Sequence, residues 1–257
     1  MWIVEDVTGD SHARLIAAPD ANLSETERQR AETLLKRRLV GEPIQYVLGH
    51  ADFMSLRLAV SPAVLIPRPE TEEVCEHVLA LIHETDSPWI LDVGTGSGAI
   101  ALALKDARPD ATVLAVDLSP AALAVATSNA VRLGLDVSFI RGDALEPEFA
   151  DRAPSVFDVI VSNPPYVPRA ERESLQREVR EHEPDVALFV DVDPLVFYRA
   201  LAGHAMRLLR PGGWLVAETH MDYGQGAADV FAEKGLQEAS ILRDMSGRNR
   251  IATARRL

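Results

Sequence analysis

Features that would tie the chain to an oxidising compartment or to a membrane are scarce in its sequence. Cys75 is the single cysteine among 257 residues, so no disulfide can form within the chain. No stretch approaches the roughly 18 uncharged apolar residues that a membrane-spanning helix needs. Residues 1–15 lack a basic segment followed by an apolar run, and we therefore predict no signal peptide. These absences favour a cytoplasmic protein that does not bind a membrane.

Positive charge is also scarce. The chain has 26 Lys and Arg against 39 Asp and Glu, a formal net charge of −13. Because such a chain repels phosphate backbones, we expect no direct binding to nucleic acid. The only basic run, residues 34–39, is more typical of a solvated helix face than of a binding site. The seven histidines are scattered, without ligand spacing to Cys75 or to one another, which predicts no metal site.

What is present points to an α/β fold. Apolar strands alternate with helices from residue 88 onward, and this alternation predicts a doubly wound, mostly parallel sheet of seven strands. The last two strands lie too close in sequence for a helical crossover, so we expect a hairpin with one antiparallel strand. The expected strands are residues 89–94, 112–117, 137–143, 157–163, 214–219 and two in the tail from 236 onward, with helices at 99–107, 119–134, 196–213 and 224–235.

The first third of the chain is more irregular. Residues 22–39 read as a helix in which Ser24 and Glu27 form a capping box. Residues 41–50 contain glycines and a proline and are expected to be a connector. A half-buried strand is predicted at 53–60, followed by a short strand near 64–67 and a helix that ends near 83. No pattern specifies an oligomeric state, and our working expectation is a monomer.

A glycine-rich turn, "GTGSG", begins at the end of the strand at 89–94. Its residues are Gly94, Thr95, Gly96, Ser97 and Gly98. Glycines allow the backbone to approach a ligand closely, and Asp117, at the end of the next strand, can accept both hydroxyls of a ribose. The pattern predicts an adenosine-containing ligand. It fits a dinucleotide as well as S-adenosylmethionine, although the preceding Asp92 is more typical of methyltransferases.

Two further turns follow the third and fourth strands. Asp143 could accept a hydrogen bond from an adenine amino group, with the backbone of Ala144 meeting the ring, or it could simply form a turn. In "NPPY", residues 163–166, Pro164 and Pro165 carry no N–H. The turn therefore presents acceptors, including the Asn163 side-chain oxygen, beside the flat face of Tyr166.

Such a turn suits a planar –NH2 group. Two acceptors can hold the two N–H bonds and turn the nitrogen toward an electrophile. An amide or aromatic amine nitrogen is a poor nucleophile because its lone pair is delocalised. Positioning and stabilisation of the charge that develops must therefore supply much of the catalysis. This reasoning makes Asn163, Pro164 and Tyr166 the candidate catalytic residues.

Together these motifs resemble a known family. "DVGTGSG", Asp117 and "NPPY" resemble class I S-adenosylmethionine-dependent amino-methyltransferases. Residues 41–74, with "IPRPETE", joined to "VSNPPYVP", closely resemble the release factor glutamine methyltransferases, also called PrmC or HemK. Further matches are "HEPDVALF", "LRPGGWLVAE" and "RDMSGRNRIATAR". The resemblance covers nearly the whole chain.

The resemblance implies a function and roles for residues. It implies S-adenosylmethionine as cofactor, S-adenosylhomocysteine as product and class 1 release factors as protein substrates. The methyl acceptor would be the side-chain amide nitrogen of the glutamine in their Gly-Gly-Gln motif. Residues 94–98, Asp117 and the Asp143–Ala144 turn would hold the cofactor, which Asn163 also contacts. Asn163 and Pro164 would hold the amide, with Pro165 and Tyr166 beside it and Arg68 and Glu70 at the same mouth.

The N-terminal region departs from the family pattern. Its helical domain, which helps to dock the release factor, normally has more residues. We therefore expect a reduced or incomplete docking domain at residues 1–45, a β-hairpin linker at 46–70 and a methyltransferase domain at 71–257.

Three alternatives stay open at this point. A glutamine methyltransferase acting on a ribosomal protein differs where "PRPETE" stands here. A nucleic-acid amino-methyltransferase shares NPPY but needs base flipping and usually a basic recognition region. A non-catalytic adenosine-binding module would not need NPPY intact.

Overall fold

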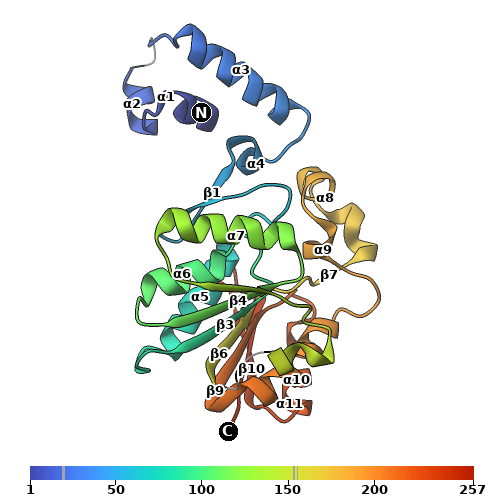
Figure 1. Ribbon diagram of the computed structural model, residues 1–257. Helices are drawn as coiled ribbons and strands as arrows, with labels where there is room; N and C mark the ends of the chain where they lie inside the picture. The colour runs from blue at the N-terminus through green and yellow to red at the C-terminus, as the bar shows by residue number, and fades with distance from the viewer. Residues whose placement is uncertain (19–20, 153, 155) are drawn as a thin grey trace.

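The computed structural model describes residues 1–18, 21–152, 154 and 156–257. Its main sheet has seven strands in the order β10–β11–β9–β6–β3–β4–β5, with helices on both faces (Figure 1). The predicted doubly wound fold is therefore confirmed, and β11 is the one antiparallel strand, pairing with β9 and β10. The strands are β3 Trp89–Val93, β4 Thr112–Asp117, β5 Ser138–Arg141, β6 Phe157–Ser162, β9 Leu209–Glu218, β10 Gln237–Arg243 and β11 Asn249–Arg255.

Alternation along the strands builds a core on each face of the sheet. Ile90 packs among residues of α5 (Pro69–Leu81) and α6 (Ala99–Ala107). Its neighbour Leu91 packs on the other face among residues of α10 (Val196–Leu208) and α11 (Gly224–Glu233). Because successive side chains of a strand point to opposite faces, a strand buried on both faces reads as a continuous apolar run. α7 (Pro120–Leu133) is capped by Ser119, whose side chain accepts from the Ala122 N–H, and Pro120 lies in its first turn.

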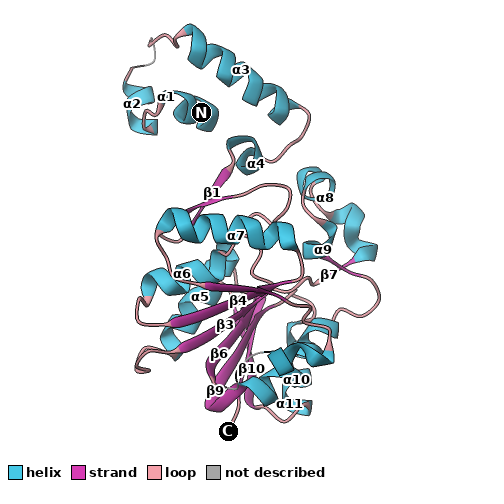
Figure 2. Cartoon of the chain, viewed as in Figure 1, coloured by secondary structure: helices cyan, strands magenta, loops and turns pink. Residues whose placement is uncertain are grey.

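The N-terminal helices lie apart from the sheet (Figure 2). They are α1 (Trp2–Thr8), α2 (His12–Ala17), α3 (Glu25–Leu39) and α4 (Ile44–Leu48). The predicted Ser24–Glu27 capping box is present. No described residue of α1, α2 or α3 is buried, so this region has little core of its own. A hairpin of β1 (His50–Phe53) and β2 (Leu56–Ala59) follows it.

A long excursion separates β6 from α10. It contains the short strands β7 (Val167–Pro168) and β8 (Phe189–Val190), which pair with each other, and the helices η2 (Arg169–Ser174), α8 (Arg177–His182) and α9 (Asp185–Leu188). A short 3-10 helix, η1 (Pro147–Arg152), precedes β6. Arg38 of α3 and Glu178 of α8 form an ion pair at 2.7 Å, which links the N-terminal helices to this excursion.

Local expectations were wrong at four places. Residues 41–50 include helix α4, because an apolar segment after Pro43 packs Tyr46 and Val47 into a core. The strand predicted at 53–60 is two strands joined by a turn at residues 54–55. Residues 64–67 pair with no strand. Helix α10 ends at Leu208, and residues 209–213 already belong to β9, since Pro211 cannot continue a helix.

In the described part of the chain, no helix combines the length and the hydrophobicity that crossing a membrane requires.

Candidate active site

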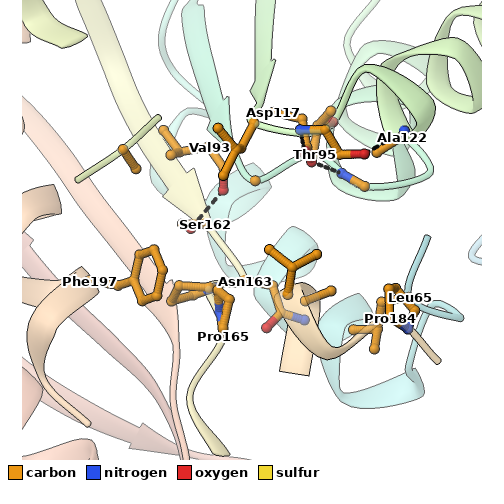
Figure 3. Close-up of a pocket in the computed structure, with 18 of the residues that line it drawn as sticks. Leu65, Val93, Thr95, Asp117, Ala122, Ser162, Asn163, Pro165, Pro184 and Phe197 are labelled. Atoms are coloured by element: carbon orange, nitrogen blue, oxygen red, sulfur yellow. Dashed lines mark hydrogen bonds between the residues drawn. The ribbon is translucent and has the colours of Figure 1, made fainter. Parts of the chain in front are cut away.

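A cavity of about 750 Å³ opens at the carboxyl ends of β3, β4 and β6. Ligands bind at this rim in open α/β sheets, where the strand order changes direction. Figure 3 shows Thr95 and Asp117 on one wall, with Asn163 and Pro165 facing them and Leu65 and Pro184 closing one end. Most of the predicted site residues line this cavity: Arg68, Gly94, Thr95, Gly96, Ser97, Asp117, Asp143, Ala144, Asn163, Pro164 and Pro165.

Three predicted residues do not line the cavity. Gly98 lies behind the turn, where a side-chain Cβ would come within 2.9 Å of Leu102 Cδ1. Its role is close packing of the turn on helices α6 and α7. Glu70 and Tyr166 are also absent from the cavity wall. Their assignments to the substrate stay predictions, as do the roles of the residues that do line it.

The glycine turn is held by backbone hydrogen bonds to the neighbouring strand. The N–H groups of Gly94 and Thr95 both donate to the Val116 carbonyl, at 2.8 and 3.0 Å. Gly94 has φ +76°, and a Cβ added to it would lie 4.0 Å from the Asn163 backbone oxygen. The turn therefore passes close to the NPPY segment, leaving a bare backbone surface toward the cavity.

Asp117 braces the same turn. Its Oδ2 accepts from the Gly96 N–H at 2.8 Å, and its Oδ1 accepts from the Ser119 N–H at 2.9 Å. Burial raises the pKa of this carboxyl, while the hydrogen bonds from Ser119 and Gly96 act to lower it. Each carboxylate oxygen keeps a second acceptor site, so Asp117 can serve the turn and a pair of ligand hydroxyls together.

The turn after β5 is organised from two sides. Asp143 Oδ1 accepts from the Leu145 N–H at 2.8 Å, which is the turn-forming role that its sequence position allowed. His204 Nε2 lies 2.8 Å from the Ala144 carbonyl and, with neutral imidazole, donates to it. Burial lowers the pKa of His204, which favours that neutral ring. The Ala144 N–H and the second Asp143 oxygen are the groups left to meet a heterocycle.

Asp92 lies buried beneath the turn. Its Oδ2 accepts from the Thr95 hydroxyl at 2.7 Å and from the Ala101 N–H at 3.2 Å. Its Oδ1 is buried with no hydrogen-bond partner in the described part of the chain. Burial raises the pKa of the Asp92 carboxyl to about 7. A buried carboxylate with an unused oxygen favours a cationic ligand near this turn.

The NPPY segment forms the opposite wall. Asn163 Nδ2 donates to Thr71 Oγ1 at 3.1 Å, and Thr71, in the first turn of α5, donates to Glu218 Oε2 at 2.6 Å. The Tyr166 hydroxyl donates to Glu218 Oε1 at 3.0 Å. Tyr166 is thus turned into the protein, toward a carboxylate. Burial raises the pKa of its hydroxyl.

Arg68 is held by another buried acid. Its Nη2 lies 2.6 Å from Glu183 Oε1, and Glu183 Oε2 accepts from the Ile66 N–H at 3.1 Å. The Glu183 side chain is 1% exposed. This pair fixes the segment 63–68. The Tyr46 hydroxyl also holds the segment, by donating to the Val64 carbonyl at 2.6 Å. The segment closes one end of the cavity.

These features fit S-adenosylmethionine. A bare glycine turn, a ribose-type carboxylate and a heterocycle turn lie around one cavity, and the buried Asp92 offers negative charge to a ligand that carries both an ammonium and a sulfonium. A dinucleotide would also meet the first three features.

Known proteins resolve this choice. A family model described as a methyltransferase domain matches residues 90–183, and one described as the PrmC N-terminal domain matches residues 1–49. A release factor glutamine methyltransferase of Bacteroides thetaiotaomicron is 39% identical over 257 residues, which is all of this chain and 91% of that protein. One of Moorella thermoacetica is 44% identical over 246 residues, covering 95% and 85%.

The chain belongs to the release factor glutamine methyltransferase family. The resemblance read from "IPRPETE" and "NPPY" is confirmed. The PrmC-type N-terminal match ends at residue 49, between α4 and β1, whereas the predicted domain boundary at residue 45 falls inside α4.

Solved structures support the fold of this family member. The T. thermophilus 16S rRNA N2 G1207 methyltransferase in complex with AdoMet and guanosine has a TM-score of 0.57 at 20% identity, covering 81% of this chain and 50% of that chain. The hMettl16 catalytic domain has a TM-score of 0.59 at 15% identity, covering 91% and 83%. At these identities the likeness concerns the fold.

Four residues of the site escaped the sequence reasoning: Thr71, Glu183, His204 and Glu218. Glu218 had a usable signal, because it ends a buried strand at the same rim as Asp117 and Asn163. Thr71 and His204 lie in helices that the sequence predicts, and Glu183 lies in a loop, but no local pattern reveals that these side chains reach the site. Among the described residues, no group of three or more His, Cys, Asp or Glu could hold a metal ion.

Proposed function

We propose that the protein transfers a methyl group from S-adenosylmethionine to the side-chain amide nitrogen (N5) of the glutamine in the Gly-Gly-Gln motif of class 1 release factors. The single observation that carries this is the NPPY wall facing the glycine turn across one cavity, in a chain of this family. The cofactor supplies an electrophilic methyl group when it is bound.

The glycine turn and the 142–145 turn bind the cofactor in this proposal. Backbone groups of residues 94–97 contact its amino-acid portion, Asp117 accepts its ribose hydroxyls, and Asp143 and Ala144 meet its adenine. Helix N-termini and glycine turns favour such close backbone contact. Arg68, held by Glu183, helps to shape the mouth through which the glutamine enters.

Asn163 and Pro164 bind the amide of the substrate. The Asn163 Oδ1 and the Pro164 carbonyl accept the two N–H bonds, which holds the nitrogen toward the methyl group. As the nitrogen–carbon bond forms, the carbon–sulfur bond breaks, S-adenosylhomocysteine is left and one amide proton passes to water. Positive charge develops on the N–H bonds, and the two acceptors stabilise it. Alignment of the nitrogen with the methyl carbon supplies the remaining advantage.

We also propose that the protein acts as a cytoplasmic monomer without binding nucleic acid or membranes directly. The net charge of −13 supports this, because an acidic surface repels phosphate groups. The single cysteine, Cys75, is buried, which suits a reducing compartment.

A transfer assay tests the proposed substrate. The protein is incubated with methyl-labelled S-adenosylmethionine and, separately, a release factor, the same factor with Gln→Ala in its Gly-Gly-Gln motif, ribosomal protein and DNA. We expect label on the unaltered factor alone. Equal label on the altered factor contradicts the glutamine assignment, and label on DNA or on ribosomal protein favours one of the alternative substrates.

A further inference from the structure

A chain of hydrogen-bonded, mostly buried side chains supports the Asn163 wall of the cavity. Glu218, at the end of β9, is 1% exposed, and Thr71, in the first turn of α5, is 3% exposed. Glu218 does not line the cavity, whereas Asn163 and Thr71 do. Glu218 therefore cannot touch a substrate there, and its two hydrogen-bonded partners, Thr71 and Tyr166, are the means by which it can act.

The donors and acceptors of this chain permit one arrangement. An ionised carboxylate can only accept hydrogen bonds. The Thr71 hydroxyl therefore donates its single hydrogen to Glu218 Oε2, at 2.6 Å. The Thr71 oxygen can then only accept. Asn163 must therefore present its NH2 group to Thr71, at 3.1 Å, and its Oδ1 is left for the cavity. An asparagine without such a partner could rotate and present either end.

Glu218 also binds Tyr166, at the other end of the NPPY turn. The Tyr166 hydroxyl donates to Glu218 Oε1 at 3.0 Å, so both oxygens of Glu218 are engaged by donors from residues around the NPPY segment. Burial raises the pKa of the Glu218 carboxyl, whereas the hydrogen bonds from Thr71 and Tyr166 and the positive charge of Arg250 act to lower it and favour the ionised form. Arg250 is itself held by Asp244, 3.2 Å away, and by the Thr219 carbonyl.

We propose that Glu218 and Thr71 are positioning residues that fix the Asn163 side chain with its oxygen toward the methyl-accepting amide. This inference rests on the proposed function and deepens it. It also accounts for two motifs that no ligand contact explains. "WLVAE" delivers Glu218 to the rim of the sheet, and the "RDMSGRNR" hairpin delivers Asp244 and Arg250 behind it.

The kinetic test uses the full chain, a purified release factor and S-adenosylmethionine at pH 8. Thr71→Val removes the hydroxyl at nearly constant volume. We expect kcat to fall about 10- to 100-fold, by analogy with the loss of an outer partner that orients a metal-binding side chain. The dissociation constant of S-adenosylmethionine should change less than twofold. Thr71→Ser keeps the hydroxyl and should retain kcat within about threefold.

Glu218→Gln tests the charge. A carboxamide that still accepts from Tyr166 donates from its NH2 group to Thr71. The Thr71 hydroxyl hydrogen is then free to be donated to the Asn163 oxygen, which would reverse the Asn163 amide. We expect kcat to fall at least about tenfold, again without loss of cofactor affinity. Thr253→Val is the matched control: Thr253 is also buried, on β11, and its hydroxyl has no partner in the described part of the chain. This control should keep kcat within about twofold.

A second readout is independent of the methyl acceptor. The chain has four asparagines, so protein labelled with ¹⁵N only at asparagine gives few side-chain NH2 signals, and Asn163→Ala identifies the Asn163 pair. Thr71→Val and Glu218→Gln should both speed solvent exchange of that NH2 group at least about tenfold. Thr71→Ser and Thr253→Val should leave it within about threefold.

The two readouts separate the two proposals. A wild-type protein that leaves the release factor unlabelled refutes the proposed function, while slow exchange that Thr71→Val abolishes still supports the orienting chain. The inference is overturned if Thr71→Val keeps both kcat and exchange within twofold of the wild type. Equal losses in Thr71→Val and Thr71→Ser, or a loss confined to cofactor affinity, overturn it as well.

Discussion

The two walls of the cavity are built in different ways. The glycine turn of the cofactor wall is organised by contacts over short sequence distances: Asp92 binds Thr95 and Ala101, and Asp117 binds the Gly96 N–H, 21 residues away. The Ala144 turn of that wall is the exception, because His204 contacts it from 60 residues away. On the substrate wall, Asn163 depends on Thr71, 92 residues away, and Thr71 depends on Glu218, 147 residues away. The glycine turn of the cofactor wall is formed within a strand–turn–helix unit and its neighbouring strand. The substrate wall forms only when elements far apart in sequence pack together.

This difference suits what each wall must do. A cofactor shared by many enzymes can be held by backbone groups, and those come with a local turn. Discrimination of one amide among other N–H groups requires a side chain of fixed orientation, which needs a rigid supporting layer. Substitutions on the first wall should therefore change cofactor affinity, and substitutions on the second should change turnover.

The largest expected effect is that of Asn163→Ala. Loss of one of the two amide acceptors should lower kcat at least about 10²- to 10³-fold, the range seen when a single preorganised hydrogen-bonding group is removed. Affinity for S-adenosylmethionine, measured by calorimetry, should stay within a few-fold. A collapse of cofactor affinity would instead make Asn163 part of the first wall and break the comparison.

Asp117→Asn should give the opposite pattern. A neutral amide accepts weaker hydrogen bonds from ribose hydroxyls and offers one acceptor atom where the carboxylate has two. We expect the dissociation constant of S-adenosylmethionine to rise about 10- to 100-fold, the effect of weakening hydrogen bonds to a charged group. At saturating cofactor, kcat should fall only a few-fold. Normal cofactor affinity in this variant would contradict the assignment of Asp117.

Asp92→Asn probes the buried acid beneath the turn. The folded pKa of Asp92, about 7, exceeds its ordinary value of 3.8. Folding therefore gains stability from the protonated form, fully below about pH 4, and loses it as the pH rises through about 7. Three pH units correspond to an upper bound of about 4 kcal/mol, which weaker hydrogen bonds from Thr95 and Ala101 partly offset.

We expect Asp92→Asn to stabilise the cofactor-free protein by about 1–2 kcal/mol at pH 8 and by little at pH 5. Denaturant unfolding at both pH values measures this. The same variant should bind S-adenosylmethionine more weakly, because it removes the negative charge. Equal stability changes at the two pH values would show that Asp92 does not titrate in this range.

Tyr166→Phe should have the smallest effect. It removes one of the two hydroxyl donors to Glu218 but leaves the Thr71 contact that holds Asn163. We expect kcat to fall about two- to fivefold, because the lost hydrogen bond acts on Asn163 only through Glu218, with unchanged cofactor affinity. A loss as large as that of Asn163→Ala would mean that Tyr166 contacts the substrate directly, as the sequence motif suggested.

Most residues of the glycine-turn side of the cavity could be predicted from the sequence, although Gly98 does not line the cavity. Gly94, Gly96 and Asp117 were found from spacing, because a strand, a glycine turn and a second strand place them together in any such fold. Asn163 was found in the same way, from its position at a strand end. The supporting layer could not be found, since Thr71 reads as an ordinary residue at the start of a helix and Glu183 as one acid among many.

The sequence by itself determined the sheet, the order of its motifs along one rim and the chemistry of an acceptor-rich turn, because these follow from side-chain periodicity and from the missing N–H groups of Pro164 and Pro165. Only the tertiary structure decided which way Asn163 points and why Tyr166 faces inward. Both orientations depend on Glu218, a carboxylate at the end of β9 that is buried only when the elements pack together. A buried acceptor determines the hydrogen-bond directions of the donors around it.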